Sequence, residues 1–258
     1  MILQPQERRG LILEKLKQHG KIDIDDLVTQ LHVSGMTIRR DLALLEEEEK
    51  IIRTHGGAIL KKQIIVETPF RAKEGKHSEQ KKEIAQAAIG LLRDDSTIIL
   101  DSGTTTLEIA KLLRKKQHLT IITNDIKIAA ELVDSELKVI VAGGELQNTV
   151  GALFGPATEQ LLKNVHVDFC FLGAHAVHLD AGLTVPTFAK ASIKKLMIEA
   201  AETTWLVADS SKFHQISLAK VCDLSEIDGV ITDHQITNEL EKELKEHLEI
   251  IKVDGSGI

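Results

Sequence analysis

A short stretch with the sequence DSGTTT combines residue types that bind anions. It follows an apolar run over residues 97–100 and precedes a helical pattern that begins at Leu107. Glycine lets the backbone approach a phosphate closely, while threonine hydroxyls and the amides at a helix N-terminus donate hydrogen bonds to it. The stretch therefore predicts a phosphate seat, with an ordinary strand-to-helix turn capped by Thr104 as the alternative. Its residues are Asp101, Ser102, Gly103, Thr104, Thr105 and Thr106.

Further polar and small residues lie at or just beyond the expected ends of other strands. In an open parallel sheet, ligands bind beyond the carboxyl ends of the strands, so these residues are expected to converge with DSGTTT. Two lysines among them are candidate cations near the phosphate. A solvated helix residue is the alternative for Lys194, and a salt-bridged loop is the alternative for Asp209 and Lys212. The additional candidates are Asn124, Gly143, Gly144, Gly173, Asp209, Lys194 and Lys212.

The first 60 residues predict a second site, because their pattern is typical of a winged helix-turn-helix. Apolar residues recur with helical spacing between residues 24 and 31, and Ser34 is expected to cap a following helix from Met36 to about Glu47. Two β-prone runs around Gly56 and Gly57 then predict a small hairpin. In such a unit the second helix enters the major groove of DNA and presents its N-terminal side chains to base edges.

The candidate DNA contacts lie on the face of this helix opposite its apolar stripe and on the hairpin. Arg40 could read guanine with two hydrogen bonds, while Arg39 and Arg53 could reach phosphates. The alternative is a small helical domain with a solvated arginine pair. The predicted DNA-contacting residues are Ser34, Met36, Thr37, Arg39, Arg40, Arg53, Thr54 and His55.

The pattern along the 258-residue chain predicts two domains. A winged helix-turn-helix is expected over 1–62, a linker with Pro69 and Gly75 over 63–77, and an effector domain over 78–258. In the effector domain apolar strands alternate with helices, which predicts an α/β fold with a Rossmann-like, doubly wound parallel sheet.

Composition sets limits on partners and location. The formal net charge is −7, but residues 1–62 hold 11 Lys and Arg against 10 Asp and Glu. Nearly all the excess of acidic residues is therefore C-terminal, and a local basic face remains available for DNA. No apolar run approaches the roughly 20 residues that span a bilayer. Residues 1–10 hold no apolar signal-peptide core, so we expect a cytoplasmic protein with no membrane partner. Cys170 and Cys222 lack metal-ligand spacing and predict inert thiols and no metal site.

These motifs resemble the DeoR family of bacterial transcriptional regulators. The resemblance rests on VSGMTIRRDL at 33–42 and RTHGGA at 53–58, and it continues in DSGTTT, in GGE at 143–145 and in ADSSKF at 208–213. It implies an effector domain similar in fold to phosphosugar isomerases, with a phosphorylated sugar as effector. The family usually has glycine where this chain has Glu49, and the run of four glutamates that ends there is expected to face away from DNA.

Catalysis is the main alternative function. Isomerases of this fold carry a dense acidic cluster after a central strand, whereas the matching stretch, 168–175, has the single acid Asp168. Asp168 could orient a sugar hydroxyl, but no second carboxylate stands beside it as a base. The sequence therefore predicts no catalytic residue and no cofactor. A phosphosugar isomerase with a fused DNA-binding arm stays open as an alternative.

We expect a regulator that binds double-stranded operator DNA, most simply a repressor of a sugar-catabolism operon that a sugar phosphate releases. An activator of the same family is the other possibility. Paired half-sites in DNA require symmetry, so a homo-oligomer, a dimer or a tetramer, is expected.

Overall fold

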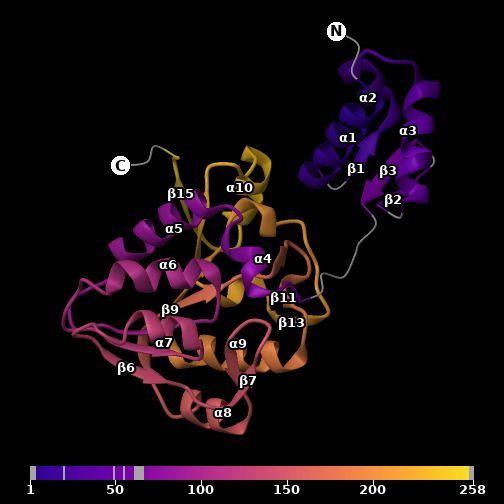
Figure 1. Ribbon diagram of the computed structural model, residues 1–258. Helices are drawn as coiled ribbons and strands as arrows, with labels where there is room; N and C mark the ends of the chain where they lie inside the picture. The colour runs from indigo at the N-terminus through magenta and orange to yellow at the C-terminus, as the bar shows by residue number, and fades with distance from the viewer. Residues whose placement is uncertain (1–3, 20, 49, 55, 61–66, 256–258) are drawn as a thin grey trace. The chain divides into compact units, whose positions relative to one another are not determined.

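The computed structural model describes residues 4–19, 21–48, 50–54, 56–60 and 67–255. The chain divides into two compact units, Met1–Gln63 and Ile64–Ile258, each with its own hydrophobic core. Figure 1 shows the first unit in indigo and the second running from magenta to yellow.

The first unit combines three helices with a three-stranded antiparallel sheet, which confirms the predicted winged helix-turn-helix. Asp23 and Ser34 begin the second and third helices, because their side-chain oxygens accept hydrogen bonds from the amides of Asp25 and Thr37. The elements are α1 (Pro5–His19), β1 (Lys21–Asp23), α2 (Ile24–Leu31), α3 (Gly35–Glu47), β2 (Ile51–Arg53) and β3 (Gly57–Leu60), and the sheet order is β1-β3-β2.

A buried ion pair holds α3 against α1. Arg8 Nε lies 2.6 Å from Asp41 Oδ2, and the two side chains are 7% and 5% exposed. On the same side of α3, Ile38, Leu42 and Leu45 pack into the small core, as the apolar spacing predicts. The opposite face of α3 is therefore left to solvent.

The second unit is built on a seven-stranded parallel sheet in the order β15-β14-β12-β9-β4-β5-β6, which confirms the Rossmann-like prediction. The direction of winding reverses between β4 and β9, and at such a switch point the connections leave a crevice beyond the strand ends. The strands are β4 (Thr97–Leu100), β5 (Thr120–Thr123), β6 (Lys138–Val141), β9 (Val167–Gly173), β12 (Ala201–Val207), β14 (Gly229–Asp233) and β15 (Glu249–Val253).

Helices cover both faces of this sheet because its strands alternate their side chains between two apolar clusters. In β9, for example, Phe169 and Phe171 pack on one face while Cys170 and Leu172 pack on the other. The first face carries α5 (Ser78–Gly90), α6 (Thr104–Leu113) and α7 (Ile126–Glu131) (Figure 1). The second face carries α8 (Pro156–Leu162), α9 (Phe188–Ala200) and α10 (Asn238–Leu244).

Several short elements are absent from the sequence-based prediction, since runs of three or four residues are too short to show a period. They are the hairpin of β7 (Glu145–Gln147) and β8 (Ala152–Phe154), and a small sheet of β10 (Ala176–His178), β11 (Gly182–Val185) and β13 (Ala219–Cys222). Two 3-10 turns, η1 (Ser210–Lys212) and η2 (Leu224–Glu226), complete the unit.

The structure corrects the predicted linker over 63–77. A short helix, α4 (Phe70–Glu74), begins after Pro69 and ends before Gly75. Phe70 is buried in the apolar cluster on the sheet face that carries α5, α6 and α7. Its amide donates a hydrogen bond to Thr149 O at 3.1 Å, and Lys127 Nζ lies 4.1 Å from its ring centroid. Residues 67–77 are therefore packed as part of the second unit, while 63–66 lie outside the described residues.

Both cysteines are buried and form no disulfide. Burial raises the pKa of the Cys222 thiol to about 12 and raises that of Cys170 further, so both thiols are protonated near neutral pH. In the part of the chain that the structure describes, no helix is long and apolar enough to cross a membrane, and no group of three or more His, Cys, Asp or Glu side chains could hold a metal ion.

Two adjacent glycines in the hairpin of the first unit provide a matched test of its packing. A Cβ atom at Gly57 would lie 1.8 Å from Ile22 O, whereas one at Gly56 would lie 3.4 Å from Asp23 Oδ2, an ordinary contact. We expect Gly57→Ala to force β1 and β3 apart and to destabilise the first unit by at least about 2 kcal/mol, as overpacking does. Thermal unfolding of both variants checks this, and equal melting temperatures for the two would contradict the described β1–β3 register.

Candidate effector pocket and DNA-contacting surface

A pocket of about 380 Å³ lies beyond the carboxyl ends of the central strands, within the size range of small-ligand sites. The structure brings together most of the residues predicted for the effector. Nearly all of them lie at or beyond the ends of β4, β5, β9 and β12, and Lys194 lies on α9. The predicted residues that line the pocket are Asp101, Ser102, Gly103, Thr104, Thr105, Asn124, Gly173, Lys194, Asp209 and Lys212.

Three residues join at the switch point of the sheet and form the floor of the pocket. Asp101 Oδ2 accepts a hydrogen bond from the amide of Gly173 at 2.9 Å and forms an ion pair with Lys194 Nζ. Lys194 Nζ also donates to Gly173 O at 2.7 Å. The side chains of Asp101 and Lys194 are 2% and 9% exposed, so Lys194 is a buried ion-pair partner and the solvated alternative is wrong.

The DSGTTT turn leaves the start of α6 open to the pocket. Gly103 is the N-cap residue of α6 and has no side chain to cap it, and Thr104 does not take that role. The first amides of a helix lack partners within the helix, so they can donate to a ligand. Thr106 is fully buried, and its Oγ1 donates to Gly103 O at 3.1 Å, so it braces the turn and does not line the pocket.

Two residues that line the pocket each carry a buried oxygen with no hydrogen-bond donor among the described residues. These oxygens are Asn124 Oδ1 and Asp209 Oδ2, on residues that are each 1% exposed. Asn124 Nδ2 donates to Leu153 O, and Asp209 Oδ1 accepts from the amide of Ser211, so both side chains are held in place. Lys212 Nζ lies 3.9 Å from Asp209 Oδ2, beyond hydrogen-bond range. Because buried acceptors without donors are costly, these oxygens are suited to ligand hydroxyl groups.

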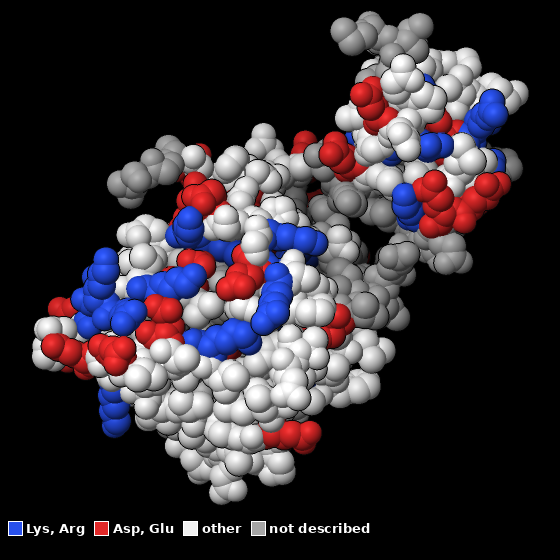
Figure 2. All heavy atoms as spheres, viewed as in Figure 1, with Lys and Arg blue, Asp and Glu red and all other residues white. Residues whose placement is uncertain are grey.

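The pocket is strongly cationic. Burial lowers the pKa of the Lys73 ammonium to about 8 and also lowers the pKa of Lys81. The pKa of Lys73 is lowered further by Lys190 and Lys212, and that of Lys81 by Lys212. An anionic ligand would therefore offset the cost of burying these charges and their mutual repulsion. Figure 2 shows basic side chains gathered over the face of the second unit that carries α4, α5 and α6. The lysines that line the pocket are Lys73, Lys76, Lys81, Lys190, Lys194 and Lys212, against the carboxylates Asp101 and Asp209.

The sequence prediction missed four of these lysines, those at 73, 76, 81 and 190. Lys81 could have been found, because it lies three residues before Ile84 on the buried face of α5, whereas Lys82 is exposed and pairs with Glu79. Lys73 and Lys76 fall in the segment that the sequence predicts to be a linker.

Asp168 is placed far from the predicted site. It lies at the start of β9, where its Oδ2 accepts a hydrogen bond from the amide of Thr97 at 2.7 Å. This is the amino edge of the parallel sheet, opposite the pocket, so the predicted role for Asp168 at a sugar hydroxyl is wrong.

Gly143 and Gly144 do not line the pocket either. Gly143 O accepts from Thr158 Oγ1 at 2.6 Å. Gly144 has φ of +154°, and a Cβ there would lie 2.2 Å from Phe154 O. The two glycines therefore shape the turn that leads into β7.

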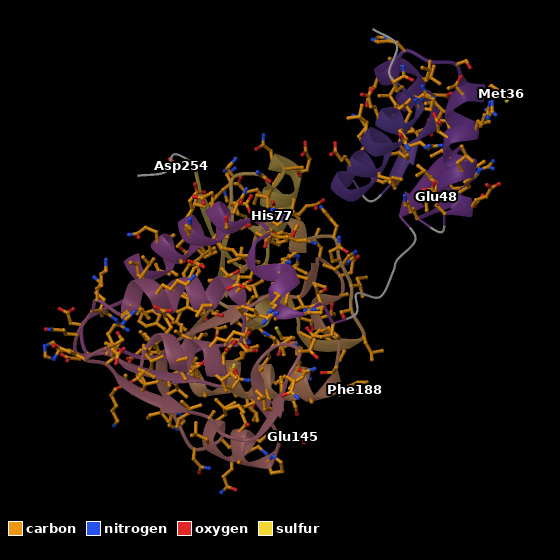
Figure 3. All side chains as sticks on the ribbon, viewed as in Figure 1. Met36, Glu48, His77, Glu145, Phe188 and Asp254 are labelled. Carbon is orange, nitrogen blue, oxygen red and sulfur yellow. The ribbon has the colours of Figure 1, made fainter. Side chains whose placement is uncertain are left out.

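The predicted DNA-contacting residues form an exposed surface on α3 and β2. Met36 is 73% exposed and points outward from α3 (Figure 3), and Arg39 and Arg40 are also exposed. Ser34 and Thr37 share a hydrogen bond at the start of α3, so their hydroxyls stabilise the helix end. Arg53 and Thr54 are exposed at the end of β2 and just beyond it, and His55 lies outside the described residues.

The acidic run at the end of α3 lies close to the hairpin. Glu46 Oε1 accepts a hydrogen bond from the amide of Arg53 at 3.2 Å, and Glu46 Oε2 lies 3.9 Å from Arg53 Nη1. Glu48 pairs with Lys50 at 2.6 Å, and Glu49 lies outside the described residues. Glu46 therefore lies beside Arg53, the residue of the hairpin that is predicted to contact a DNA phosphate.

Comparison with known proteins gives matches over most of the chain. Residues 8–64 match the DeoR-like helix-turn-helix domain, and residues 76–234 match the DeoR C-terminal sensor domain. The chain is 37% identical over 251 residues to a putative aga operon transcriptional repressor of Escherichia coli O157:H7, covering 96% of this chain and 93% of that protein. It is 34% identical over 228 residues to the glycerol-3-phosphate regulon repressor of Escherichia coli K12, covering 88% and 90%.

A solved structure, ribose 5-phosphate isomerase A from Methanocaldococcus jannaschii, is similar over 54% of this chain and 55% of that one. The sequence identity is 17% and the TM-score 0.41.

The lowered pKa of Lys73 predicts how anion binding depends on pH. The groups that face Lys73 are Glu67, Lys190 and Lys212. Above about pH 8 the Lys73 ammonium loses its proton, so the affinity of the pocket for sulfate, whose charge is constant over this range, should fall severalfold between pH 7 and pH 9. Calorimetric titration measures this fall. Lys73→Arg keeps its charge, and its profile should be flatter. A wild-type affinity that does not change with pH would show that the charge of Lys73 does not act on the bound anion.

Proposed function

The chain belongs to the DeoR family of DNA-binding transcriptional regulators, and on that premise we propose that its pocket binds a phosphorylated sugar that controls binding of the first unit to operator DNA. The relatives are transcriptional repressors, so the chain is a regulator and not an enzyme. The domain over residues 76–234 is its sensor domain.

The observation that carries this proposal is the pairing of two kinds of group in one pocket. The open start of α6 and the lysines around it attract an anion, and phosphate is an anion that helix N-termini bind. Asn124 Oδ1 and Asp209 Oδ2 lack donors, and hydroxyl groups can supply them. A molecule that carries both a phosphate and several hydroxyls uses both features, and the name of the glycerol-3-phosphate regulon repressor is in keeping with such a ligand.

Neither Asp101 nor Asp168 is placed to act as the base of an isomerase. A base that moves a proton between sugar carbons must have a free carboxylate within reach of the substrate. Asp101 is held by Lys194 and by the amide of Gly173, and Asp168 lies at the opposite edge of the sheet. These two carboxylates therefore have structural roles.

We propose that the protein is a cytoplasmic repressor of a sugar-catabolism operon. The sugar phosphate binds more tightly to a form of the protein with low DNA affinity and so shifts the population toward that form. A symmetric oligomer, a dimer or a tetramer, would place two copies of α3 on paired half-sites of double-stranded DNA.

The exposed face of α3 predicts which side chain reads DNA. Arg40→Ala should weaken binding to an operator, selected from random duplexes by the wild-type protein, by about ten- to a hundredfold, which corresponds to the loss of one two-hydrogen-bond contact to a base. Fluorescence anisotropy measures the affinity. The control is Arg114→Ala, an exposed arginine on the second unit whose removal should change nothing. If Arg40→Ala binds like the wild type, α3 is not the recognition helix.

The pocket predicts a ligand class that thermal shift can identify. A ligand at a hundredfold its dissociation constant adds about 2.7 kcal/mol of stability, so a sugar phosphate that binds should raise the melting temperature by several degrees, while its unphosphorylated sugar should not. Thr105→Val, which removes a pocket hydroxyl, should reduce the shift, and Thr203→Val on β12 should leave it unchanged. A panel of sugar phosphates with no shift, or equal shifts from the unphosphorylated sugars, would contradict the proposed effector.

A further inference from the structure

Glu67, three residues before the start of α4, places a carboxylate between two lysines of the pocket. Lys190 Nζ, on α9, donates a hydrogen bond to Glu67 Oε2, and Lys73 Nζ, on α4, lies 3.6 Å from Glu67 Oε1. Glu67 and Lys190 are 123 residues apart in the sequence, whereas Lys73 follows Glu67 by only six residues. Both lysines line the pocket, and their side chains are 9% and 23% exposed. A carboxylate of the chain itself thus pairs with two lysines that line the ligand pocket, although Glu67 is not itself among the lining residues.

This ion pair leaves the cationic charge of this corner of the pocket, formed by Lys73 and Lys190, incompletely balanced. Glu67 Oε1 is buried and accepts no hydrogen bond among the described residues. Lys73 and Lys190 repel each other, as do Lys73 and Lys212. Although burial opposes ionisation, the pKa of Glu67 is lowered, because Lys190, Lys73 and His175 lie beside it. The single negative charge of Glu67 therefore faces more than one positive charge. An anion with two negative charges, such as a phosphate dianion, would balance these lysines better.

The corner is built from different elements than the phosphate seat. The seat consists of the start of α6 with Lys81 and Lys212, which lie near Asp209. The corner consists of Lys73 and Lys190 on α4 and α9. Both contribute to one continuous pocket, so one ligand can reach both.

We propose that Lys73 and Lys190 form a second anion subsite, which Glu67 fills in the ligand-free protein. The effector is then a polyhydroxy compound with two acidic groups, a phosphate in the seat at α6 and a second phosphate or a carboxylate in place of the Glu67 carboxylate. This inference rests on the proposed function, because it concerns the same pocket.

The exchange has a consequence for regulation because of where Glu67 lies in the chain. It follows the first unit, which ends at Gln63, and precedes α4. The second acidic group of the ligand and the segment that leads from the DNA-binding unit compete for the same two lysines. Effector binding therefore changes the contacts of that segment directly, while Phe70 keeps α4 anchored in the core.

The experiment counts sulfate ions bound per chain by calorimetric titration at pH 7 and low ionic strength. We expect the wild-type protein to bind one sulfate, in the seat at α6, and Glu67→Gln to bind two, since the amide keeps the shape of the side chain and removes the competing charge. The second sulfate should bind to Glu67→Gln at least tenfold more tightly than any second sulfate binds to the wild-type protein. Lys190→Gln in the Glu67→Gln background should return the count to one.

Glu74→Gln is the matched control, because it removes the same charge from an exposed position on α4 outside the pocket lining. It should bind one sulfate, so a second site in this variant as well would show a general charge effect and overturn the inference. Glu67→Ala should also bind two sulfates, and it replaces Glu67→Gln if that variant is unfolded at the temperature of the titration. One sulfate in both Glu67 variants overturns the second subsite and leaves the proposed function in place. No sulfate in the wild type, or one that Thr105→Val does not weaken, counts instead against the phosphate seat itself.

Discussion

The buried ion pair between Asp101 and Lys194 is the interaction on which the pocket depends. It lies where the sheet reverses its winding, so it joins the end of β4 to α9, and through Gly173 it also joins both to the end of β9. Burying two charges is costly unless further hydrogen bonds satisfy them, and the amide and carbonyl of Gly173 supply these bonds. Ser102 and Gly103 follow Asp101 directly and line the pocket, so the start of α6 lies at the pocket as well.

The major elements of both units could be predicted because each carries a long or strongly marked pattern. The strands of the large sheet are apolar runs separated by helical spacing, and α3 begins at a serine that caps it as expected. The pocket residues that follow strands were found for a topological reason, since carboxyl ends of parallel strands share one edge. Asp168 was misplaced because it stands at the start of β9, and the start of a parallel strand lies at the other edge.

The rest of the pocket could not be predicted because its residues meet only through tertiary packing. Glu67 and Lys190 are 123 residues apart, and no local pattern links them. Proline and glycine around α4 are typical of a linker, yet here Pro69 precedes a five-residue helix that one buried aromatic side chain anchors. Charge gave no signal either, since a lysine in a sequence is ordinarily solvated, and only the fold shows that Lys73 and Lys190 are largely buried.

A pocket with buried, mutually repelling lysines stores part of the free energy that drives its response. In the ligand-free protein, burial lowers the pKa of Lys73 to about 8, so its charge is destabilising below that pH. An anionic ligand removes this penalty, and the gain adds to its binding free energy. A ligand can shift a conformational equilibrium only by the difference in its affinity for the two forms. If the form that binds DNA keeps Glu67 between the two lysines, the ligand must displace this carboxylate in order to bind that form. This displacement lowers the ligand's affinity for the form that binds DNA relative to its affinity for the other form.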